Sequence, residues 1–354
     1  MKRVATVFCC LVLLATHGCK SRPTSTALKN EDVKDEKACL FGEPDLVGAG
    51  SPGADAVDFL TWKIVKATSL ASQLAYQDEQ SVRRQAAAWG YPNVDYFQAG
   101  TMIGFLMSND KCAVLSFRGT DFFSLRDWFV NLNAKSLRVR KGFVHGGFYS
   151  ALNRLKPQVD RAVGNRNVKN KKFWVTGHSL GGALAGLYAY STSIEPLLFK
   201  GPEISKVITF GQPIFTDHVL AAEMRNLFIE RYFRVVNETD LVATVPYWLT
   251  HFGSLIWMRQ TKIQFIPDLH LAGGPAGGGG TNVKPAEIPQ ELMPTKDSLQ
   301  EFLDATADMP AGAVMPNQLA DPVSFGSRWP KSLADHLMNN YIGRITSEIN
   351  ELGQ

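Results

Sequence analysis

Ser179 stands in a stretch whose residue types suit nucleophilic chemistry. The segment Gly177-His178-Ser179-Leu180-Gly181 follows a short apolar run and precedes a run of small residues. A strand, a tight glycine-flanked turn and a helix together hold a serine hydroxyl out of a sheet. Gly177 and Gly181 leave room for the turn, and the N–H of Leu180 at the helix start can stabilise an oxyanion. We therefore predict that Ser179 is a nucleophile.

Such a serine needs a histidine base and a carboxylate that fixes the tautomer of the histidine. On a parallel α/β sheet, the acid and then the histidine follow the serine along the chain. Asp240 lies four residues beyond a predicted strand at 232–236 and is the preferred acid. Asp217, placed after the preceding predicted strand, is the alternative.

Of the seven histidines, three follow the preferred acid. His336 lies just before a predicted C-terminal helix and is the preferred base, with His270 as the alternative. His251 precedes a predicted strand, and we expect it to be structural. His178 borders the nucleophile, but neighbouring side chains along a backbone point apart, so we expect it to support the turn.

A second contribution to an oxyanion hole is predicted from Phe117-Arg118-Gly119-Thr120-Asp121, which ends an early strand. A backbone N–H of the following loop and the hydroxyl of Thr120 would join the N–H of Leu180. The alternative interpretation of this segment is an ordinary β-turn.

The apolar spacing predicts alternating strands and helices, which must position these side chains. Strands are expected at 102–107, 113–117, 173–176, 207–210, 232–236 and within 255–264, and helices at 55–80, 127–132, 144–155, 182–191 and 219–227. This order predicts an α/β fold with a mostly parallel central sheet and helices on both faces. The candidate residues then gather at the carboxyl ends of the strands.

The composition agrees with an ordinary globular enzyme. The 354 residues are 45% hydrophobic and 20% charged, with a net charge of +4. This mild charge gives no case for nucleic-acid binding, which needs clustered Lys and Arg on one element. The densest basic run, at 169–172, reads as a solvated loop. No metal-binding cysteine spacing is present, and no cofactor is predicted.

Residues 1–18 have the pattern of an export signal. Lys2 and Arg3 precede an apolar stretch at 4–15 that is too short to span a bilayer. Gly18-Cys19 resembles the processing site of bacterial lipoproteins, in which the cysteine carries the lipid. We expect export and membrane anchoring through Cys19, in the outer membrane if the cell is Gram-negative, with plain secretion as the alternative.

A polar tether at 19–52 is expected to precede one domain at 53–354. A Gly- and Pro-rich excursion at 273–330 interrupts this domain, with a short helical stretch at 299–307. Cys39 and Cys112 remain after removal of the signal, and they either pair in an oxidising compartment or stay as buried thiols.

Several segments together resemble the class 3 lipase family, the fungal-lipase-like branch of the α/β-hydrolases. They occur in family order across about residues 55–345. The matching segments are Ser116-Phe117-Arg118-Gly119-Thr120-Asp121, Arg126-Asp127-Trp128-Phe129-Val130-Asn131-Leu132, Val144-His145-Gly146-Gly147-Phe148, Gly177-His178-Ser179-Leu180-Gly181-Gly182, Thr209-Phe210-Gly211-Gln212-Pro213, Val236-Asn237-Glu238-Thr239-Asp240-Leu241-Val242 and Asp335-His336.

The resemblance implies an α/β-hydrolase fold with a triad of Ser179, Asp240 and His336. It also implies an oxyanion hole of Thr120 and Leu180. A lid segment is implied at 122–128, whose substrate-facing residues are Phe122, Phe123 and Leu125.

The implied activity is hydrolysis of lipid esters at a lipid interface, by a triacylglycerol lipase or a phospholipase A1. Two alternatives are kept. One is a non-catalytic envelope lipoprotein that uses the fold for binding, and the other is a small-ester or feruloyl-type esterase.

Overall fold

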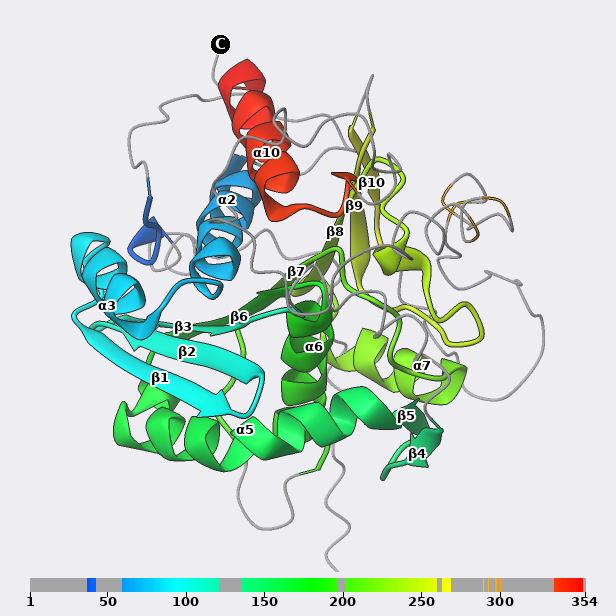
Figure 1. Cartoon of the computed structure of the whole chain (residues 1–354), viewed down its shortest axis with the longest axis horizontal. Helices are drawn as coiled ribbons and strands as arrows, with labels where there is room; N and C mark the ends of the chain where they lie inside the picture. Colours follow the sequence, from blue (N-terminus) through cyan, green and yellow to red (C-terminus); the bar gives the residue numbers. More distant parts are fainter. Residues whose placement is uncertain are drawn as a thin grey trace, which may run out of the picture.

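The architecture is an eight-stranded sheet with helices on both faces (Figure 1). The computed structural model describes residues 37–42, 59–120, 135–195, 201–259, 263–268 and 334–352, with the single residues 289, 292, 297 and 300. The predicted signal and tether, the candidates Phe122, Phe123, Leu125 and His270, the helix at 127–132 and nearly all of the excursion at 273–330 lie outside these residues. Within the described ranges, no helix has both the length and the apolar character needed to cross a bilayer.

The sheet is parallel in its centre and antiparallel at its edges. Its order is β1 (Asn93–Ala99), β2 (Met102–Ser108), β3 (Cys112–Phe117), β6 (Lys172–His178), β7 (Lys206–Phe210), β8 (Tyr232–Asn237), β9 (Ser254–Met258) and β10 (Ile263–Ile266). The five strands from β3 to β9 run parallel, whereas β1, β2 and β10 join antiparallel. The predicted mostly parallel sheet is therefore confirmed.

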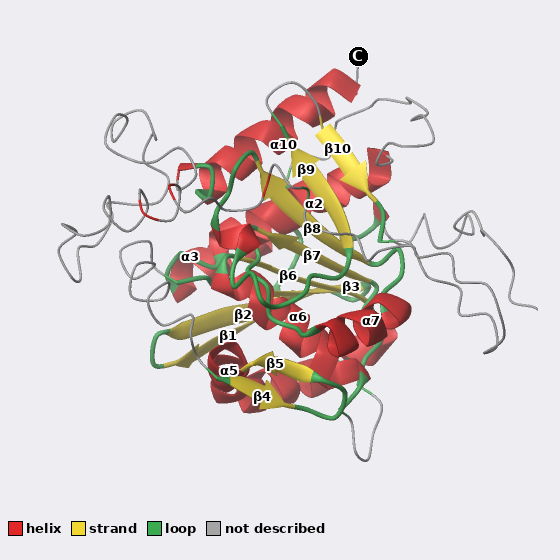
Figure 2. Ribbon diagram, turned by 90° about the vertical axis from the view of Figure 1, so that its right-hand side faces the viewer, coloured by secondary structure: helices red, strands yellow, loops and turns green. Residues whose placement is uncertain are grey.

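Two groups of helices cover the sheet (Figures 1 and 2). One face carries α2 (Phe59–Leu74), α3 (Glu79–Ala88) and α10 (Met338–Leu352), and the other carries α5 (Gly146–Asn165), α6 (Leu180–Ser193) and α7 (His218–Leu227). In β6, Phe173 and Val175 join the α5–α6 core while Trp174 joins the α2–α10 core. This alternation buries both faces of the strand, which is why its sequence is a continuous apolar run.

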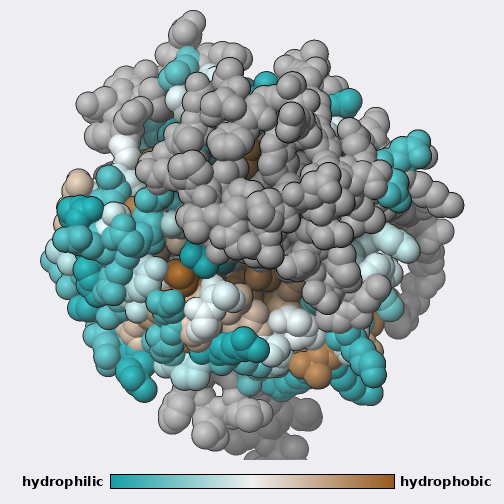
Figure 3. All heavy atoms as spheres, viewed as in Figure 1, coloured by the Kyte–Doolittle hydropathy of each residue, from teal (hydrophilic) through white to brown (hydrophobic). Residues whose placement is uncertain are grey.

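The outer surface differs from these cores in composition. In the view of Figure 3 the margin of the described surface is largely hydrophilic, and hydrophobic residues show mainly toward the middle.

The helix predicted over 55–80 is two helices in the structure. α2 ends at Leu74, and Asp78 then caps α3 by accepting a 2.9 Å hydrogen bond from the N–H of Ser81. A carboxylate at this position satisfies one of the unpaired donors of the first turn, so it starts a new helix.

The helix predicted over 144–155 is displaced in the structure. Its first residues form β5 (Phe143–His145), which pairs with β4 (Ser136–Arg138), and α5 then runs from Gly146 to Asn165. Pro157 lies inside α5 without ending it. The apolar face of α5, which includes Leu152, Leu155 and Val159, continues across the proline and packs on the core.

A disulfide joins Cys39 to Cys112 at the start of β3, with a Cα–Cα distance of 5.5 Å. Of the two possibilities left open by the sequence, the structure has the paired form. The bridge joins residues 37–42 covalently to β3 of the sheet.

Candidate active site

Ser179 occupies the turn between β6 and α6 with a φ of +57°, a conformation rare for residues other than glycine. The turn is held by a 2.9 Å hydrogen bond from its N–H to the carbonyl of Phe210. A Cβ on Gly177 would lie within 3.0 Å of the Gly181 backbone, and one on Gly181 within 3.0 Å of the Phe117 backbone. The predicted need for glycine on both sides of the serine therefore has a direct steric cause.

His336 and Asp240 form a buried pair beside this turn. The Nδ1 of His336 lies 2.9 Å and 2.8 Å from the two carboxylate oxygens of Asp240. Because a carboxylate only accepts, Nδ1 carries the hydrogen and Nε2 of the neutral ring is left as an acceptor. This is the tautomer that a general base requires.

Asp240 is ionised despite its complete burial. Burial alone would raise its pKa, but the charge and hydrogen bond of His336 and the hydrogen bond of Tyr341 lower the pKa below its usual value. The N–H of Val242 also donates to its Oδ1 at 2.9 Å. The carboxylate is therefore fixed in place and available to stabilise an imidazolium.

The Ser179 turn and the His336 ring are neighbours. The ring of His178 lies 4.5 Å from that of His336, centroid to centroid. A Cβ on Gly211, next to the Phe210 that binds the Ser179 N–H, would lie 2.8 Å from Nδ1 of His336. The Oγ of Ser179 and the Nε2 of His336 are both buried, and neither has a hydrogen-bond partner among the described residues. Catalytic hydrogen bonds are often long before substrate binds.

His178 supports this arrangement, as expected from its sequence position. Its Nε2 lies 2.7 Å from the carbonyl oxygen of His336, and the hydroxyl of Tyr76 lies 2.8 Å from its Nδ1. Burial, and then the charge of His336, lower the pKa of His178 to about 3, so it stays neutral. Tyr76 had no distinguishing sequence signal.

The loops that carry the acid and the histidine are bound to each other. Asp335 accepts hydrogen bonds from the N–H and hydroxyl of Thr239 at 3.2 Å and 2.9 Å. The side chain of Asn237 donates to the carbonyl of Asp335 at 3.0 Å. These contacts fix the segment before His336 against the end of β8.

Both predicted oxyanion-hole residues lie next to Ser179. Leu180 opens α6, so its N–H has no carbonyl partner within the helix. A Cβ on Gly119 would lie 2.9 Å from the Cβ of Ser179, which places the loop with Thr120 against the turn.

The alternative residues have structural positions. Asp217 caps α7 by accepting a 2.9 Å hydrogen bond from the N–H of Leu220. His251 is buried with its Nε2 at 2.7 Å from the carbonyl oxygen of Ala243. The geometry thus favours Asp240 and His336 over Asp217.

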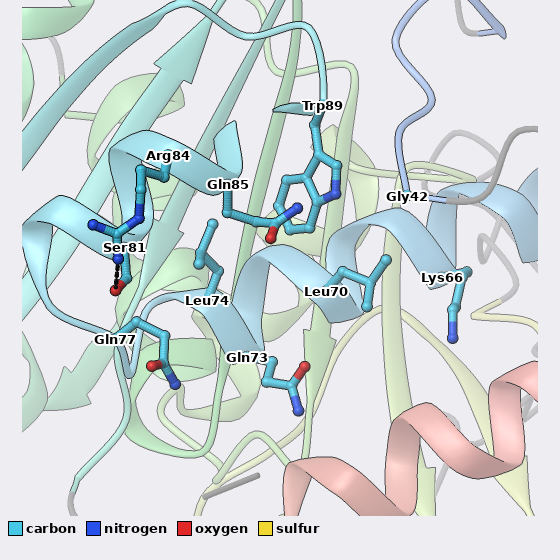
Figure 4. A pocket seen from close by; sticks show the side chains of 10 residues that line it. All are labelled: Gly42, Lys66, Leu70, Gln73, Leu74, Gln77, Ser81, Arg84, Gln85 and Trp89. Atoms are coloured by element: carbon cyan, nitrogen blue, oxygen red, sulfur yellow. Dashed lines mark hydrogen bonds between the residues drawn. The ribbon is translucent and has the colours of Figure 1, made fainter. Parts of the chain in front are cut away.

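A surface cleft of about 610 Å³ lies between α2 and α3 (Figure 4). Leu74, Gln77, Arg84 and Trp89 are among its lining residues. Ser179, Asp240, His336, Thr120 and Leu180 are not among its described lining residues, so it is separate from the Ser179 turn.

The parallel sheet, the strained serine turn at the end of β6 and the placement of the acid after β8 define an α/β-hydrolase fold. The order of Ser179, Asp240 and His336 along the chain is also the order of nucleophile, acid and histidine in this class.

Comparison with known proteins narrows the class. Residues 114–250 match the family model described as Lipase (class 3). This match assigns residues 114–250 of the chain to the class 3 lipase family. The matched segment includes positions 179 and 240 but not 336, so the pairing of His336 with Asp240 is an observation of the structure alone.

Similar proteins include a triacylglycerol lipase, OBL1, of Ricinus communis, 29% identical over 252 residues that cover 53% of this chain and 48% of the relative. Lipase ZK262.3 of Caenorhabditis elegans is 30% identical over 154 residues, covering 42% of this chain and 43% of the relative. The solved triacylglyceride lipase of Rhizomucor miehei matches at 22% identity and a TM-score of 0.49, covering 62% of this chain and 89% of that one. The chain spans about half the length of the plant relative.

Proposed function

We propose that this protein is a serine hydrolase that cleaves carboxylic ester bonds of lipids, with Ser179 as nucleophile, His336 as base and Asp240 as orienting acid. The observation that carries the proposal is the buried His336–Asp240 pair beside a strained serine whose hydroxyl has no partner within the described structure. An unsatisfied buried hydroxyl and an unsatisfied buried imidazole nitrogen are costly unless they serve a ligand or a reaction.

In this mechanism the Oγ of Ser179 attacks the ester carbonyl carbon while its proton passes to Nε2 of His336. The N–H of Leu180 and the Thr120 loop stabilise the oxyanion. The tetrahedral intermediate collapses, and the alcohol leaves with the proton from His336. Water, deprotonated by His336, then attacks the acyl-enzyme and releases the carboxylic acid and free Ser179.

Lipid esters are the favoured substrates because the family is a lipase family and the similar plant proteins are named triacylglycerol lipases. Phospholipase A1 activity is the second candidate within the same chemistry. Activity confined to soluble small esters would instead favour the small-ester or feruloyl-type alternative.

Export is part of the proposal and rests on the sequence of residues 1–19. The basic start, the short apolar stretch and Gly18-Cys19 favour a lipid-anchored protein. The intact mass of protein extracted from membranes tests this directly, because lipidation of Cys19 adds the mass of its acyl chains.

Hydrolysis of a soluble short-chain ester by the purified protein, beside Ser179→Ala, tests the chemistry. We expect the substitution to remove turnover while folding is kept. Triacylglycerol emulsions and phosphatidylcholine vesicles then separate the two lipid activities. Equal activity of the wild type and Ser179→Ala would refute the proposal, and a stable fold with no turnover on any ester would favour the binding-protein alternative.

Asp240→Asn and Asp217→Asn form a matched pair for the acid. We expect Asp240→Asn to lower kcat by about 10⁴-fold, because the wrong tautomer of His336 is then held. Asp217→Asn keeps a good helix cap, so its kcat should stay near that of the wild type. The reverse result would assign the acid to Asp217.

A further inference from the structure

Large apolar side chains are exposed on two neighbouring segments that the mechanism does not use. Tyr247 and Trp248 are 63% and 48% exposed, and their rings make an edge-on contact at 5.2 Å. Leu137 and Phe143, on the β4–β5 hairpin, are 44% and 41% exposed. We call the hairpin at 135–143 and the loop at 245–250 the hairpin–loop face.

Backbone hydrogen bonds join the two segments through the strip at 214–217. The N–H of Asp217 donates to the carbonyl of Phe143 at 3.0 Å, and the N–H of Thr250 donates to the carbonyl of Thr216 at 2.7 Å. Ile214 also donates to the carbonyl of Val245 at 2.8 Å. The three segments are therefore hydrogen-bonded side by side. In the hairpin Phe143 lies opposite Arg138, on the same side of the ribbon, whereas Leu137 lies opposite the buried Val144.

The two segments carry charge of one sign, and the carboxylate of Asp217, in the strip between them, accepts the N–H of Leu220. Residues 135–147 contain Lys135, Arg138, Arg140 and Lys141 and no acidic residue, and residues 242–252 contain no acidic residue either. Lys135, Arg138 and Lys141 are exposed and form no ion pair with any described residue. The guanidinium of Arg140 donates a 2.8 Å hydrogen bond to the carbonyl of Ile194, which is an uncharged partner.

The hairpin–loop face lies at the edge of the sheet that holds Ser179, where the parallel strands end. In a parallel sheet the helix after a strand begins at the carboxyl end of that strand. α6 begins directly after Ser179. α5 and α7 begin directly after His145, which ends the hairpin, and Asp217, which is bonded to Phe143 of the hairpin. Figure 2 shows β4, β5 and α7 on the side of the molecule that faces the viewer.

We infer that the hairpin–loop face docks on an anionic phospholipid surface and holds the Ser179 side of the molecule toward it. Tyr and Trp favour the headgroup level of a bilayer, where the ring is apolar and its polar atom stays hydrated. Unpaired Lys and Arg beside them attract anionic headgroups. The purpose of this docking rests on the proposed function, but the binding itself does not.

Sedimentation with vesicles tests the inference, using the chain from residue 19 onward with Cys19→Ser, so that no lipid anchor contributes. We expect binding to vesicles of phosphatidylcholine with phosphatidylglycerol at least about tenfold tighter than to phosphatidylcholine alone. Arg138→Glu with Lys141→Glu should weaken binding to the anionic vesicles at least about tenfold. Tyr247→Ser with Trp248→Ser should weaken binding to both kinds of vesicle.

The matched control is Lys111→Glu with Lys169→Glu, which reverses two exposed charges before β3 and β6, at the opposite end of the sheet. It should bind within about twofold of the parent protein, since electrostatic attraction to the surface fades within a Debye length. Circular dichroism and turnover of a soluble ester report that each variant is folded.

Equal loss in the control, or no preference for anionic vesicles, would overturn the inference. It would also be overturned if Tyr247→Ser with Trp248→Ser converted a dimer of this chain into monomers and left vesicle binding unchanged. The hairpin–loop face would then be an interface between two copies of the chain. Vesicle binding without ester hydrolysis would contradict the proposed function alone. Ester hydrolysis without vesicle binding would contradict only the docking inference.

Discussion

The hydroxyl of Tyr341 donates a hydrogen bond to Oδ2 of Asp240 at an oxygen–oxygen distance of 2.6 Å. The hydroxyl oxygen of Tyr341 in turn accepts a 3.0 Å hydrogen bond from the N–H of Asn237. Tyr341 belongs to α10, so the C-terminal helix is bound directly to the carboxylate that orients His336. The packing of α10 therefore helps to keep Asp240 ionised, because it holds the Tyr341 hydroxyl against the carboxylate.

Tyr341→Phe should lower kcat on a soluble ester by about tenfold, since it removes a hydrogen bond to a buried charge. The pKa of Asp240 should rise because that bond favours the ionised form. The acid limb of the pH–rate profile should then move to higher pH. Tyr91→Phe, which loses a 2.6 Å hydrogen bond to the carbonyl of Cys39, is the control. An unshifted acid limb would show that Tyr341 has no effect on the carboxylate.

Gly211→Ala should disable the site, whereas Gly343→Ala should not. Gly211 has a φ of +54°, and a Cβ there would lie 2.5 Å from Oδ2 of Asp240 and 2.8 Å from Nδ1 of His336. We expect a loss of kcat of about 100-fold or more from displacement of the pair. A Cβ on Gly343 in α10 meets nothing within 4 Å, so this change should raise helix stability by up to about 1 kcal/mol. Equal activity of the two variants would contradict the geometry.

Stability should fall as the pH drops below about 6.5. Burial lowers the pKa of His178 to about 3, and burial together with Arg234 lowers the pKa of His251. Both bind a proton on unfolding, where the histidine pKa is about 6.5, so the unfolded state gains from acid. We expect the free energy of unfolding in urea to fall by about 1–3 kcal/mol between pH 6 and pH 5.

His251→Gln should reduce this pH dependence, and His218→Gln, at an exposed position, should not. A free energy of unfolding that is equal at pH 5 and pH 6 would contradict the buried neutral state of the two histidines.

The disulfide should contribute measurably to stability. It closes a separation of 73 residues, and removing such a bridge typically costs about 2–5 kcal/mol. Cys39→Ser with Cys112→Ser should therefore lower the thermal midpoint. A reductant should lower the midpoint of the wild type and leave that of the variant unchanged. No effect of reductant on the wild type would show that the bridge is not formed in solution.

The serine turn could be predicted because its causes are local. Gly177, Ser179 and Gly181 stand within five residues, and the steric contacts that require them involve their own turn and the end of β3. The β2–β3 hairpin was predictable for the same reason, since Asn109 accepts hydrogen bonds from the N–H groups of Lys111 and Cys112 in its own turn.

The network around the site could not be predicted, because it joins residues far apart in the chain. Tyr341 is 101 residues from Asp240, and Tyr76 is 102 residues from His178. A tyrosine on an amphipathic helix has no feature that distinguishes such a contact from ordinary packing. β1 was also missed, since this edge strand mixes polar and apolar residues and its pairing with β2 supplies what its own pattern lacks.

Covalent labelling with a p-nitrophenyl alkylphosphonate tests the central claim most directly, because the reagent reacts with an activated serine and does not depend on the natural substrate. One phosphonyl group per chain should be found on Ser179 by peptide mass spectrometry. Ser179→Ala should not be labelled, and His336→Ala should be labelled far more slowly. A label on another residue, or equal labelling of Ser179→Ala, would contradict the assignment of Ser179 as the nucleophile.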